Sequence, residues 1–451
     1  MIRKIWEPIF MGRQLALWLG LGSLTGALVG VVVTYFLKLL FWSIGQTAHW
    51  PFWMIAVALP LGGLVTGLLI HYGAPRAAGH GTEAVIRSVH RDKGSIPWKV
   101  APIKALATIT TIAPGGSAGK EGPSAQIGAA VASALADLFH FTPERRQKIV
   151  ICGIGAGFAA VFGTPVAGAI LGIEVLAVGD LWYDMLLPSF AASVMSYEVS
   201  KRLGLSWFYP TTNVTLHFTV GLFARLIVFG VASGLVAYLL VLLMDGFHNL
   251  SEKVERARHW WRPLFPFFGA VALVLLMLMV GRSYGGLSLP LLNQALSGHS
   301  VPMLAFWWKL LMVAMTLGFG MSGGIVTPLF VVGATFGSLV AAPLHLPLAA
   351  GAELGMVAVT ASGANVPIAM IIMGMELFGS RLSPDFLMVA IPAFIIIGNH
   401  SVYPSQRVRL QKSPWVPIPV GRALEDAEEE KLPAPWIRKH LKKRPPQRGA
   451  S

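Results

Sequence analysis

The sequence predicts an all-α integral membrane protein made of two related halves whose helices are interrupted within the membrane. Of its 451 residues, 55% are hydrophobic and 12% are charged, and the mean hydropathy is +0.65. Soluble globular chains carry about 25% charged residues, so most of this surface is not suited to water. Several apolar runs approach or reach the length of a membrane span; they are Leu15–Phe41, Phe52–Ile70, Val220–Met244, Leu264–Val280 and Phe386–Ile397.

The net charge of +14 is gathered in short basic segments, which does not favour nucleic-acid binding. Basic flanks on short loops are typical of the cytoplasmic side of a membrane protein. We therefore expect a multi-pass protein with both termini in the cytoplasm. The basic segments are Arg3–Lys4, Arg87–Lys104, Arg145–Lys148 and Arg438–Arg448.

Three regions are predicted along the chain. Residues 1–14 read as an amphipathic lead-in, residues 15–404 as one membrane domain, and residues 405–451 as a basic, Pro-rich cytoplasmic tail that is partly disordered. The membrane domain divides into repeats at about 15–205 and 215–404. Cys152 is the only cysteine, which excludes an intrachain disulfide and a cysteine metal cluster.

The evidence for two repeats is an echo of Gly- and Pro-rich motifs. Gly119-Lys-Glu-Gly-Pro123 is matched by Gly324-Ile-Val-Thr-Pro328 at one constant offset along the chain, and Glu174 is matched by Glu376 at nearly the same offset. Such breaks in apolar segments persist at membrane depth only where they are buried or line a cavity. Paired breaks in two halves indicate the binding site of a transporter.

Each echoed motif predicts the start of a helix, since proline is favoured in the first helical turn. We expect helices to start near Gly122 or Pro123 and near Pro328. Helix N-termini attract anions, so two of them converging would make an anion site without a full cationic charge. Glu121 is then the candidate gate, a carboxylate that occupies the anion site and swings away when protonated. The alternative is an ion pair of Glu121 with Lys120 in a solvated loop.

These motifs, in this order, resemble those of the CLC family of chloride channels and proton-coupled chloride exchangers. The first motif resembles the family's G-K/R-E-G-P filter, the second resembles G-x-F-x-P, and Ser401–Gln406 resembles the segment of the inner-gate tyrosine, here Tyr403. The resemblance implies two inverted repeats of tilted, discontinuous helices, a homodimer with one pore per subunit, and no C-terminal CBS domains. It implies an anion site at His80, Gly122, Ile325, Val326 and Tyr403, with filter positions at Gly79, Gly81, Gly119, Lys120, Pro123, Gly324 and Pro328.

Three positions depart from the family pattern. His80 stands where the anion-coordinating serine is expected, so anion affinity is expected to depend on pH unless the ring points away from the pore. Val326 replaces the filter phenylalanine. Val175 replaces the internal proton-relay glutamate, and the preceding Glu174, echoed by Glu376, is expected to have a structural role at a helix end.

The predicted function is transmembrane chloride transport gated by Glu121, with proton-coupled exchange ahead of a passive channel. A fluoride/proton antiporter is a third possibility, placed last because Pro123 is intact. A rival from another class is an intramembrane serine protease, in which Ser322 would need His217, His345 or His400 as base. We expect no enzyme activity, no cofactor and no metal site. The expected partners are a second copy, the lipid bilayer, chloride and protons, in a bacterial inner membrane.

Overall fold

The fold is almost entirely helical, as predicted. The computed structural model describes residues 2–212, 214–258 and 261–429. In that part of the chain, four helical stretches are long and apolar enough to cross a membrane, and the other helices are shorter. The four stretches are Ile9–Thr47, Phe52–Gly73, Val220–Glu255 and Arg262–Val280, and they contain four of the five apolar runs named above.

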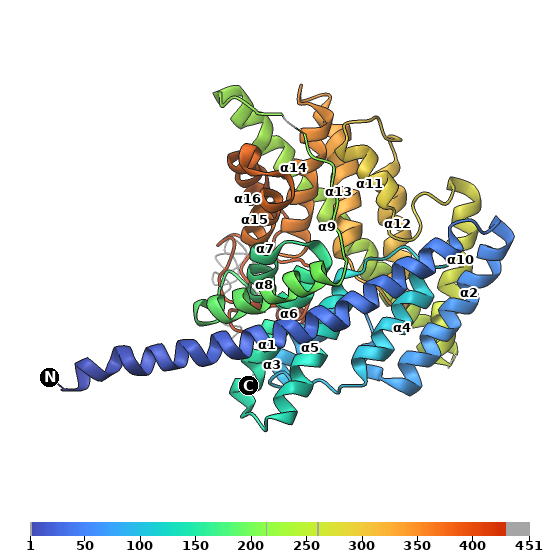
Figure 1. Ribbon diagram of the computed structural model, residues 1–451. Coiled ribbons are helices and arrows are strands. Elements are labelled where there is room, and N and C mark those ends of the chain that lie inside the picture. The colour runs from blue at the N-terminus through green and yellow to red at the C-terminus, as the bar shows by residue number, and fades with distance from the viewer. Residues whose placement is uncertain (1, 213, 259–260, 430–451) are drawn as a thin grey trace, which may run out of the picture.

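The helices divide into two sets, one in each half of the chain (Figure 1). The first half holds α1 (Ile2–Thr47), α2 (Phe52–Leu68), α3 (Thr82–Arg91), α4 (Val100–Ile112), α5 (Glu121–Leu138), α6 (Pro143–Phe162), α7 (Pro165–Glu174) and α8 (Leu186–Arg202). The second half holds α9 (Val220–Arg258), α10 (Phe265–Val280), α11 (Leu289–Leu296), α12 (Ala305–Gly318), α13 (Val326–Ala341), α14 (Leu348–Gly363), α15 (Pro367–Phe378) and α16 (Ser383–Ile396). A last short helix is α17 (Leu424–Glu429), and two short strands, β1 (Ala177–Val178) and β2 (Arg407–Val408), pair in parallel.

The two halves repeat the same arrangement of helices. Helices α12, α13 and α14 follow α4, α5 and α6 at the same offset as the filter motifs, and α15 follows α7 at the offset that relates Glu376 to Glu174. In the first half α5 packs on α6 and α1 on α8, while in the second half α13 packs on α14 and α9 on α16. The echo of motifs therefore corresponds to a duplicated fold. Helices α5 and α13 begin at Glu121 and Val326, just before the predicted starts.

Glycines at echoed positions allow the paired helices to approach closely. A Cβ on Gly128 in α5 would lie 2.3 Å from the Gly153 carbonyl oxygen in α6, and one on Gly333 in α13 would lie 2.4 Å from the Gly355 carbonyl oxygen in α14. Membrane helices have no hydrophobic driving force for association, and small residues at their contacts allow the close packing that stabilises them. Many of the glycines in the apolar segments thus serve close packing of the repeats.

Two of the predicted boundaries differ from the structure. Residues 2–14 are not a separate lead-in, because α1 continues without a break to Thr47. Residues 405–429 of the predicted partly disordered tail are ordered. There the side chains of Val408, Ile418 and Leu424 are buried against Val178 in a small apolar cluster beneath the β1–β2 pair. The rest of the predicted tail, residues 430–451, lies outside the described residues.

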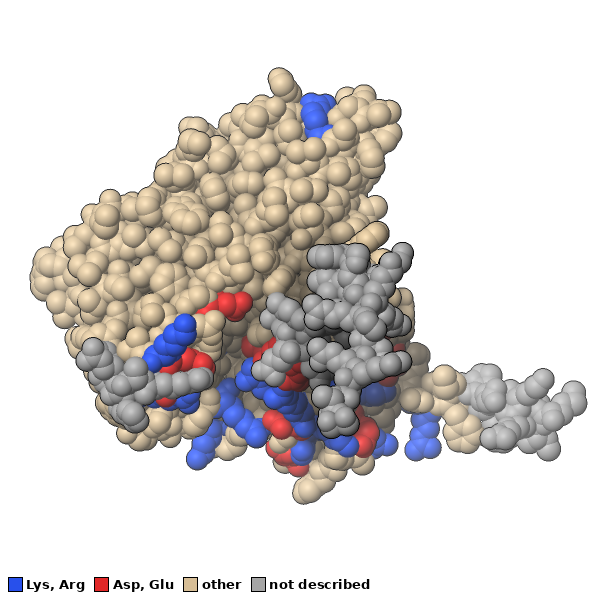
Figure 2. Space-filling view, turned by 180° about the vertical axis from the view of Figure 1, so that it is seen from behind, with Lys and Arg blue, Asp and Glu red and all other residues tan. Residues whose placement is uncertain are grey.

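Most of the charged side chains on the face drawn in Figure 2 gather at one end, and the rest of that face carries few. Exposed ion pairs occur on the loops and helix ends around α3, the end of α5 and the start of α6; they are Arg76–Asp92, Lys93–Glu144, Arg146–Asp137 and Lys148–Asp184. We call this region the charged end. Its ion pairs involve two of the basic segments that the sequence placed on the cytoplasmic side.

Candidate functional site

The first turns of α5 and α13 meet in the interior, where the two echoed motifs pair with each other. The Gly119 amide donates to the Gly324 carbonyl and the Gly324 amide donates to the Gly119 carbonyl, both at 2.6 Å, in an antiparallel bridge. Equivalent residues of the two halves thus run in opposite directions at their contact. This places two helix N-termini at one buried point, which was the predicted geometry of the anion site.

Glu121 fills the N-terminus of the opposite helix. Its Oε2 accepts a hydrogen bond of 3.0 Å from the Thr327 amide, and its Oε1 accepts another from the Thr327 hydroxyl. The residue is 1% exposed. A carboxylate from α5 therefore sits where the amides and partial positive charge of α13 would hold an anion. Thr327 was not among the predicted residues, although it lies in the echoed motif.

Lys120 does contact Glu121, but the pair is not in a solvated loop. The Lys120 Nζ lies 3.7 Å from Glu121 Oε1 and donates to the Val161 carbonyl at 3.2 Å, and Lys120 is 6% exposed. The solvated-loop alternative is therefore wrong. A cavity of about 130 Å³ reaches Lys120 between the linker that carries Trp207 and Tyr209 and the helix α11.

The loop before α3 packs directly on the start of α5. A Cβ on Gly122 would lie 2.0 Å from the His80 carbonyl oxygen, and one on Gly81 would lie 2.4 Å from the Gly122 carbonyl oxygen. Gly81 also has φ +91°, a conformation that favours glycine. Two of the predicted filter glycines are therefore required by the close contact between this loop and α5.

His80 faces Tyr403, with ring centroids 5.5 Å apart, so it does not point away from the site. Its loop lies outside the four apolar spans, and burial together with the charges of Lys104 and Arg87 lowers the pKa of His80 to about 3. The ring is then neutral at ordinary pH, and it can donate or accept a hydrogen bond without carrying charge. This argues against the expected pH dependence of anion affinity through His80.

Three buried polar atoms beside this ring contact have no hydrogen-bond partner among the described residues. They are His80 Nδ1, Thr82 Oγ1 and the Tyr403 hydroxyl. Buried polar groups are nearly always paired. Three together indicate a place where water or a small anion supplies the missing partner.

Most of the other predicted positions lie at the same two helix starts, and Gly79 lies in the loop before α3. Ile325 and Val326 are buried at the first turn of α13, Pro123 and Pro328 occupy the first turns of α5 and α13, and Gly79 accepts a hydrogen bond described below. The structure thus brings the predicted anion-site residues to one region. Their roles in transport stay predictions.

Buried lysines support the loops on both sides of the site, which the sequence did not reveal. Lys104 was read as part of a basic loop, but it is fully buried in α4 and donates to the carbonyls of Ala77 and Gly79, at 3.0 and 2.5 Å. Lys309 in α12 donates to the carbonyls of Tyr284 and Gly286, at 3.3 and 2.9 Å. The two lysines are separated by the same offset as the filter motifs, and this offset could have identified them in the sequence as equivalent residues of the two repeats.

The segment around Tyr403 is held by side chains rather than by a helix. Gln406 is fully buried and donates to the carbonyls of Val175 and Ala364, at 3.0 and 2.9 Å. The Ser401 hydroxyl donates to Gln406 Oε1 at 2.7 Å and accepts from the Tyr403 amide at 3.0 Å. Val175, where a relay glutamate was expected, thus contributes its carbonyl to the support of Tyr403.

Glu174 and Glu376 each cap a helix of the other half, which confirms the predicted structural role. The Glu174 oxygens accept from the amides of Ile368 and Ala369 at the start of α15, at 3.0 and 2.7 Å. The Glu376 oxygens accept from the amides of Val166 and Ala167 at the start of α7, also at 3.0 and 2.7 Å. These reciprocal caps satisfy helix amides that would otherwise be unpaired.

Among the described residues, the hydrogen-bond partners of Ser322 are threonines and not the histidine that a protease would need. Its hydroxyl lies 3.3 Å from that of Thr108, and its amide donates to the Thr111 hydroxyl at 3.2 Å, which is packing between α4 and the loop before α13. The described residues contain no group of three or more His, Cys, Asp or Glu side chains that could hold a metal.

The helices are duplicated and interrupted, and a carboxylate lies where two helix ends face each other. These features are typical of a class of membrane protein that carries small anions. The chain matches the family model described as voltage gated chloride channel over residues 62–398, and it belongs to this CLC family of channels and transporters. It is 34% identical over 438 residues to a protein of Pseudomonas syringae pv. tomato named chloride/fluoride channel protein, with 94% of this chain and 93% of the relative covered. It is 28% identical over 367 residues to the voltage-gated ClC-type chloride channel ClcB of Shigella flexneri, with 76% of this chain and 84% of the relative covered.

Solved structures agree with this membership. A CLC-type fluoride/proton antiporter aligns with a TM-score of 0.82 and 29% identity, over 87% of this chain and 98% of that one. A slow cyanobacterial chloride/proton antiporter aligns with a TM-score of 0.74, over 84% of this chain and 94% of that one, and its 20% identity supports the fold alone. The predicted CLC-type fold is thus confirmed.

Proposed function

We propose that this protein exchanges a small halide for protons, with Glu121 as the group that both blocks the anion site and carries the proton. The observation that carries the proposal is the Glu121 carboxylate on the Thr327 amide and hydroxyl at the start of α13. A protonated Glu121 would lose its charge and with it most of its attraction to this helix end. An anion could then take its place, which links the two movements.

We further propose fluoride as the preferred anion, ahead of the chloride that the sequence ranked first. A small anion is strongly hydrated and needs short, strong hydrogen bonds to replace its water. The carboxylate oxygens of Glu121 are compact acceptors of the same kind, and they receive an amide and a hydroxyl from Thr327. Fluoride also appears in the names of the Pseudomonas syringae relative and of the fluoride/proton antiporter structure.

A passive anion channel is the second candidate, and Val175 is the observation that favours it. The side chain there is buried and apolar, so the usual internal proton route is absent at that position. Under this alternative Glu121 would act as a gate without moving protons.

The deciding experiment is a reversal-potential measurement in reconstituted bilayers, with fluoride, chloride and pH gradients varied one at a time. An exchanger responds to the pH gradient at fixed anion gradient, and a channel does not. Glu121→Gln, which keeps the shape but cannot titrate, is expected to abolish proton uptake driven by an anion gradient while changing the anion flux. Unchanged proton uptake in this variant would overturn the proposed role of Glu121.

We also propose that the protein is a homodimer across the face of α7 and α15, with the charged end in the cytoplasm of a bacterium. Glu376 is exposed on the single chain, and the apolar side chains of Ile368 and Met375 in the same helix are exposed as well. A carboxylate facing lipid is costly, so a second copy covering this face is the favourable arrangement. The mass of the detergent-solubilised protein by light scattering tests this.

A further inference from the structure

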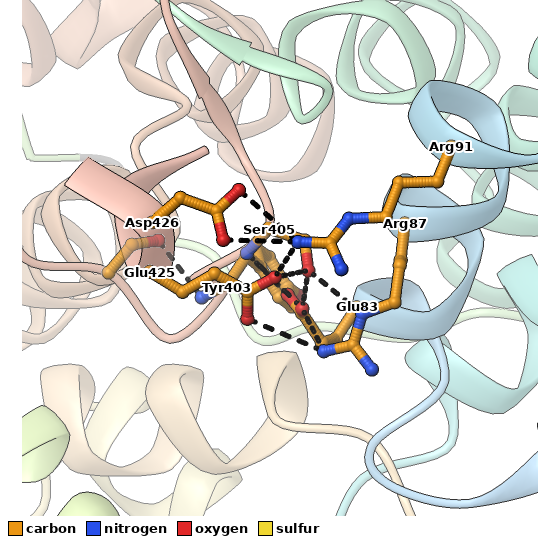
Figure 3. Close-up of polar contacts among 8 residues, drawn as sticks. Glu83, Arg87, Arg91, Tyr403, Ser405, Glu425 and Asp426 are labelled. Atoms are coloured by element: carbon orange, nitrogen blue, oxygen red, sulfur yellow. Dashed lines mark hydrogen bonds and ion pairs between the residues drawn. The ribbon is translucent and has the colours of Figure 1, made fainter. Parts of the chain in front are cut away.

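A cluster of charged residues at the charged end joins α3 to the segment that follows Tyr403 (Figure 3). Glu83, in the first turn of α3, accepts hydrogen bonds from the Ser405 amide at 3.2 Å and from the Ser405 hydroxyl. The Nη2 of Arg87 lies 3.3 Å from Glu83 Oε1 and 3.5 Å from Glu425 Oε2. Glu425 and Asp426 in turn bind Arg91, at 3.0 and 3.2 Å.

Glu83 is distinct from the other buried carboxylates of the described residues. Glu174 and Glu353 accept from backbone amides of the opposite half or of the linker, and Asp385 lies in the first turn of α16. Among the buried carboxylates of the described residues, Glu83 alone hydrogen bonds to the Tyr403 segment. Its side chain retains 11% exposure, whereas that of its partner Arg87 is 49% exposed. Glu83 thus lies between water and the inner side of the site.

Two buried hydroxyl groups lie next to Glu83 and close to its partner Ser405 along the chain, those of Thr82 and Tyr403. Thr82 precedes Glu83 and follows Gly81, whose backbone touches Gly122 at the start of α5. The Thr82 and Tyr403 hydroxyls are close enough to interact with each other, although neither makes a hydrogen bond of good geometry to a described residue. Hydroxyls are both donors and acceptors, so with a bridging water they can pass a proton from Glu83 toward Glu121.

We infer that Glu83 is the proton-accepting residue of the charged end, and that it relays protons between that side and Glu121 in place of the glutamate missing at Val175. The inference rests on the proposed proton-coupled exchange. In each transfer protonated Glu83 gives its proton to the Glu121 carboxylate and becomes a carboxylate itself, and it is reprotonated from water at the charged end. Release of an anion in the opposite sense completes the cycle.

The surroundings of Glu83 suit a group that gains and loses a proton. Helix α3 is not one of the apolar spans, and burial raises the pKa of Glu83 to about 6. The Ser405 hydroxyl and amide and the charge of Arg87 act in the opposite direction, and Glu425 adds to the increase. The charged groups that face Glu83 are thus Arg87 from its own helix and Glu425 from α17.

The test is proton and anion flux in liposomes holding the full chain, measured for Glu83→Gln with fluoride as the transported anion. Glutamine still accepts the bonds from Ser405 and Arg87 but cannot carry a proton. We expect proton uptake to fall to the level of protein-free liposomes while fluoride efflux continues. Glu425→Gln is the matched control, since it changes a carboxylate of the same cluster that the proposed relay does not use, and it is expected to keep proton uptake.

Full proton coupling in Glu83→Gln would overturn the inference. Equal loss of coupling in Ser405→Ala, which keeps the Glu83 carboxylate, would also overturn it, because the cluster would then act only by positioning Tyr403. Absence of proton movement in the wild-type protein would instead refute the proposed exchange. If Glu83→Gln does not fold, Glu83→Asp and Glu83→Asn decide: coupling kept by Asp and lost by Asn supports the relay, and equal coupling in both refutes it.

Discussion

Replacing Thr327 by valine tests whether its hydroxyl holds Glu121 in the anion site. Valine has nearly the same shape, and residue 327 is 3% exposed in the first turn of α13, so the packing is kept. The hydroxyl bond to the carboxylate is lost, while the amide bond of 3.0 Å remains. A hydrogen bond to a charged group contributes about 1.5–3 kcal/mol. At about 1.4 kcal/mol per factor of ten, the ratio of displaced to seated Glu121 should rise roughly 10- to 150-fold.

The expected result is faster anion efflux from liposomes with fewer protons moved per anion, because the site is open more of the time without protonation. Thr327→Ser is the matched control: it keeps a hydroxyl and should behave as wild type. Efflux slower than wild type in Thr327→Val would refute the reasoning, since the hydroxyl would then serve the transported anion rather than restrain the carboxylate. Equal effects of valine and serine would refute it as well.

Two further predictions concern His80 and the reciprocal helix caps. Anion affinity is measured by calorimetry at about pH 5.5 and about pH 8, and it should change with pH to the same extent in wild type and in His80→Ser. The reason is that a ring whose pKa is lowered to about 3 stays neutral at both pH values. A pH dependence of anion affinity that disappears with the substitution would show that His80 titrates in this range. Glu174→Ala should lower stability in detergent by about 2–6 kcal/mol, because a partly buried and a buried amide at the start of α15 lose their acceptor. Glu376→Ala should cost about as much, because in the proposed dimer a second copy keeps water from replacing the Glu376 oxygens; a clearly smaller loss in thermal unfolding would indicate that Glu376 stays exposed.

Much of the fold could be predicted because the duplication is visible in the chain. One offset relates the filter motifs, the starts of α5 and α13, and the lysines at 104 and 309. The missed role of Thr327 depends on the antiparallel approach of Gly119 and Gly324, which no local pattern specifies. Lys104 was misread because a lysine in a basic stretch is usually solvated, whereas here backbone carbonyls enclose it.

The order of residues 405–429 could not be predicted for a different reason. Their apolar side chains are few and irregularly spaced, so no helix or strand period stands out. They are ordered because Val408 pairs with Val178, which belongs to the first half of the chain, because Ser405 donates to Glu83, and because Gln406 donates to the Val175 carbonyl. Contacts of this kind are set by the whole fold.

The duplication would by itself make two equivalent anion sites, one at the start of α5 and one at the start of α13. The carboxylates that are present in both halves, Glu174 and Glu376, are used symmetrically as caps. Glu121 has no such symmetric partner. The residue at the equivalent position of the second repeat is Val326, whose apolar side chain cannot accept a hydrogen bond at the start of α5. The start of α13 therefore holds a side chain of the protein, and under the proposed exchange the start of α5 is left to serve the transported ion. Under the proposed exchange, this difference between the repeats turns a symmetric pair of helix ends into a gate beside a binding site, which is why the proposal centres on Glu121.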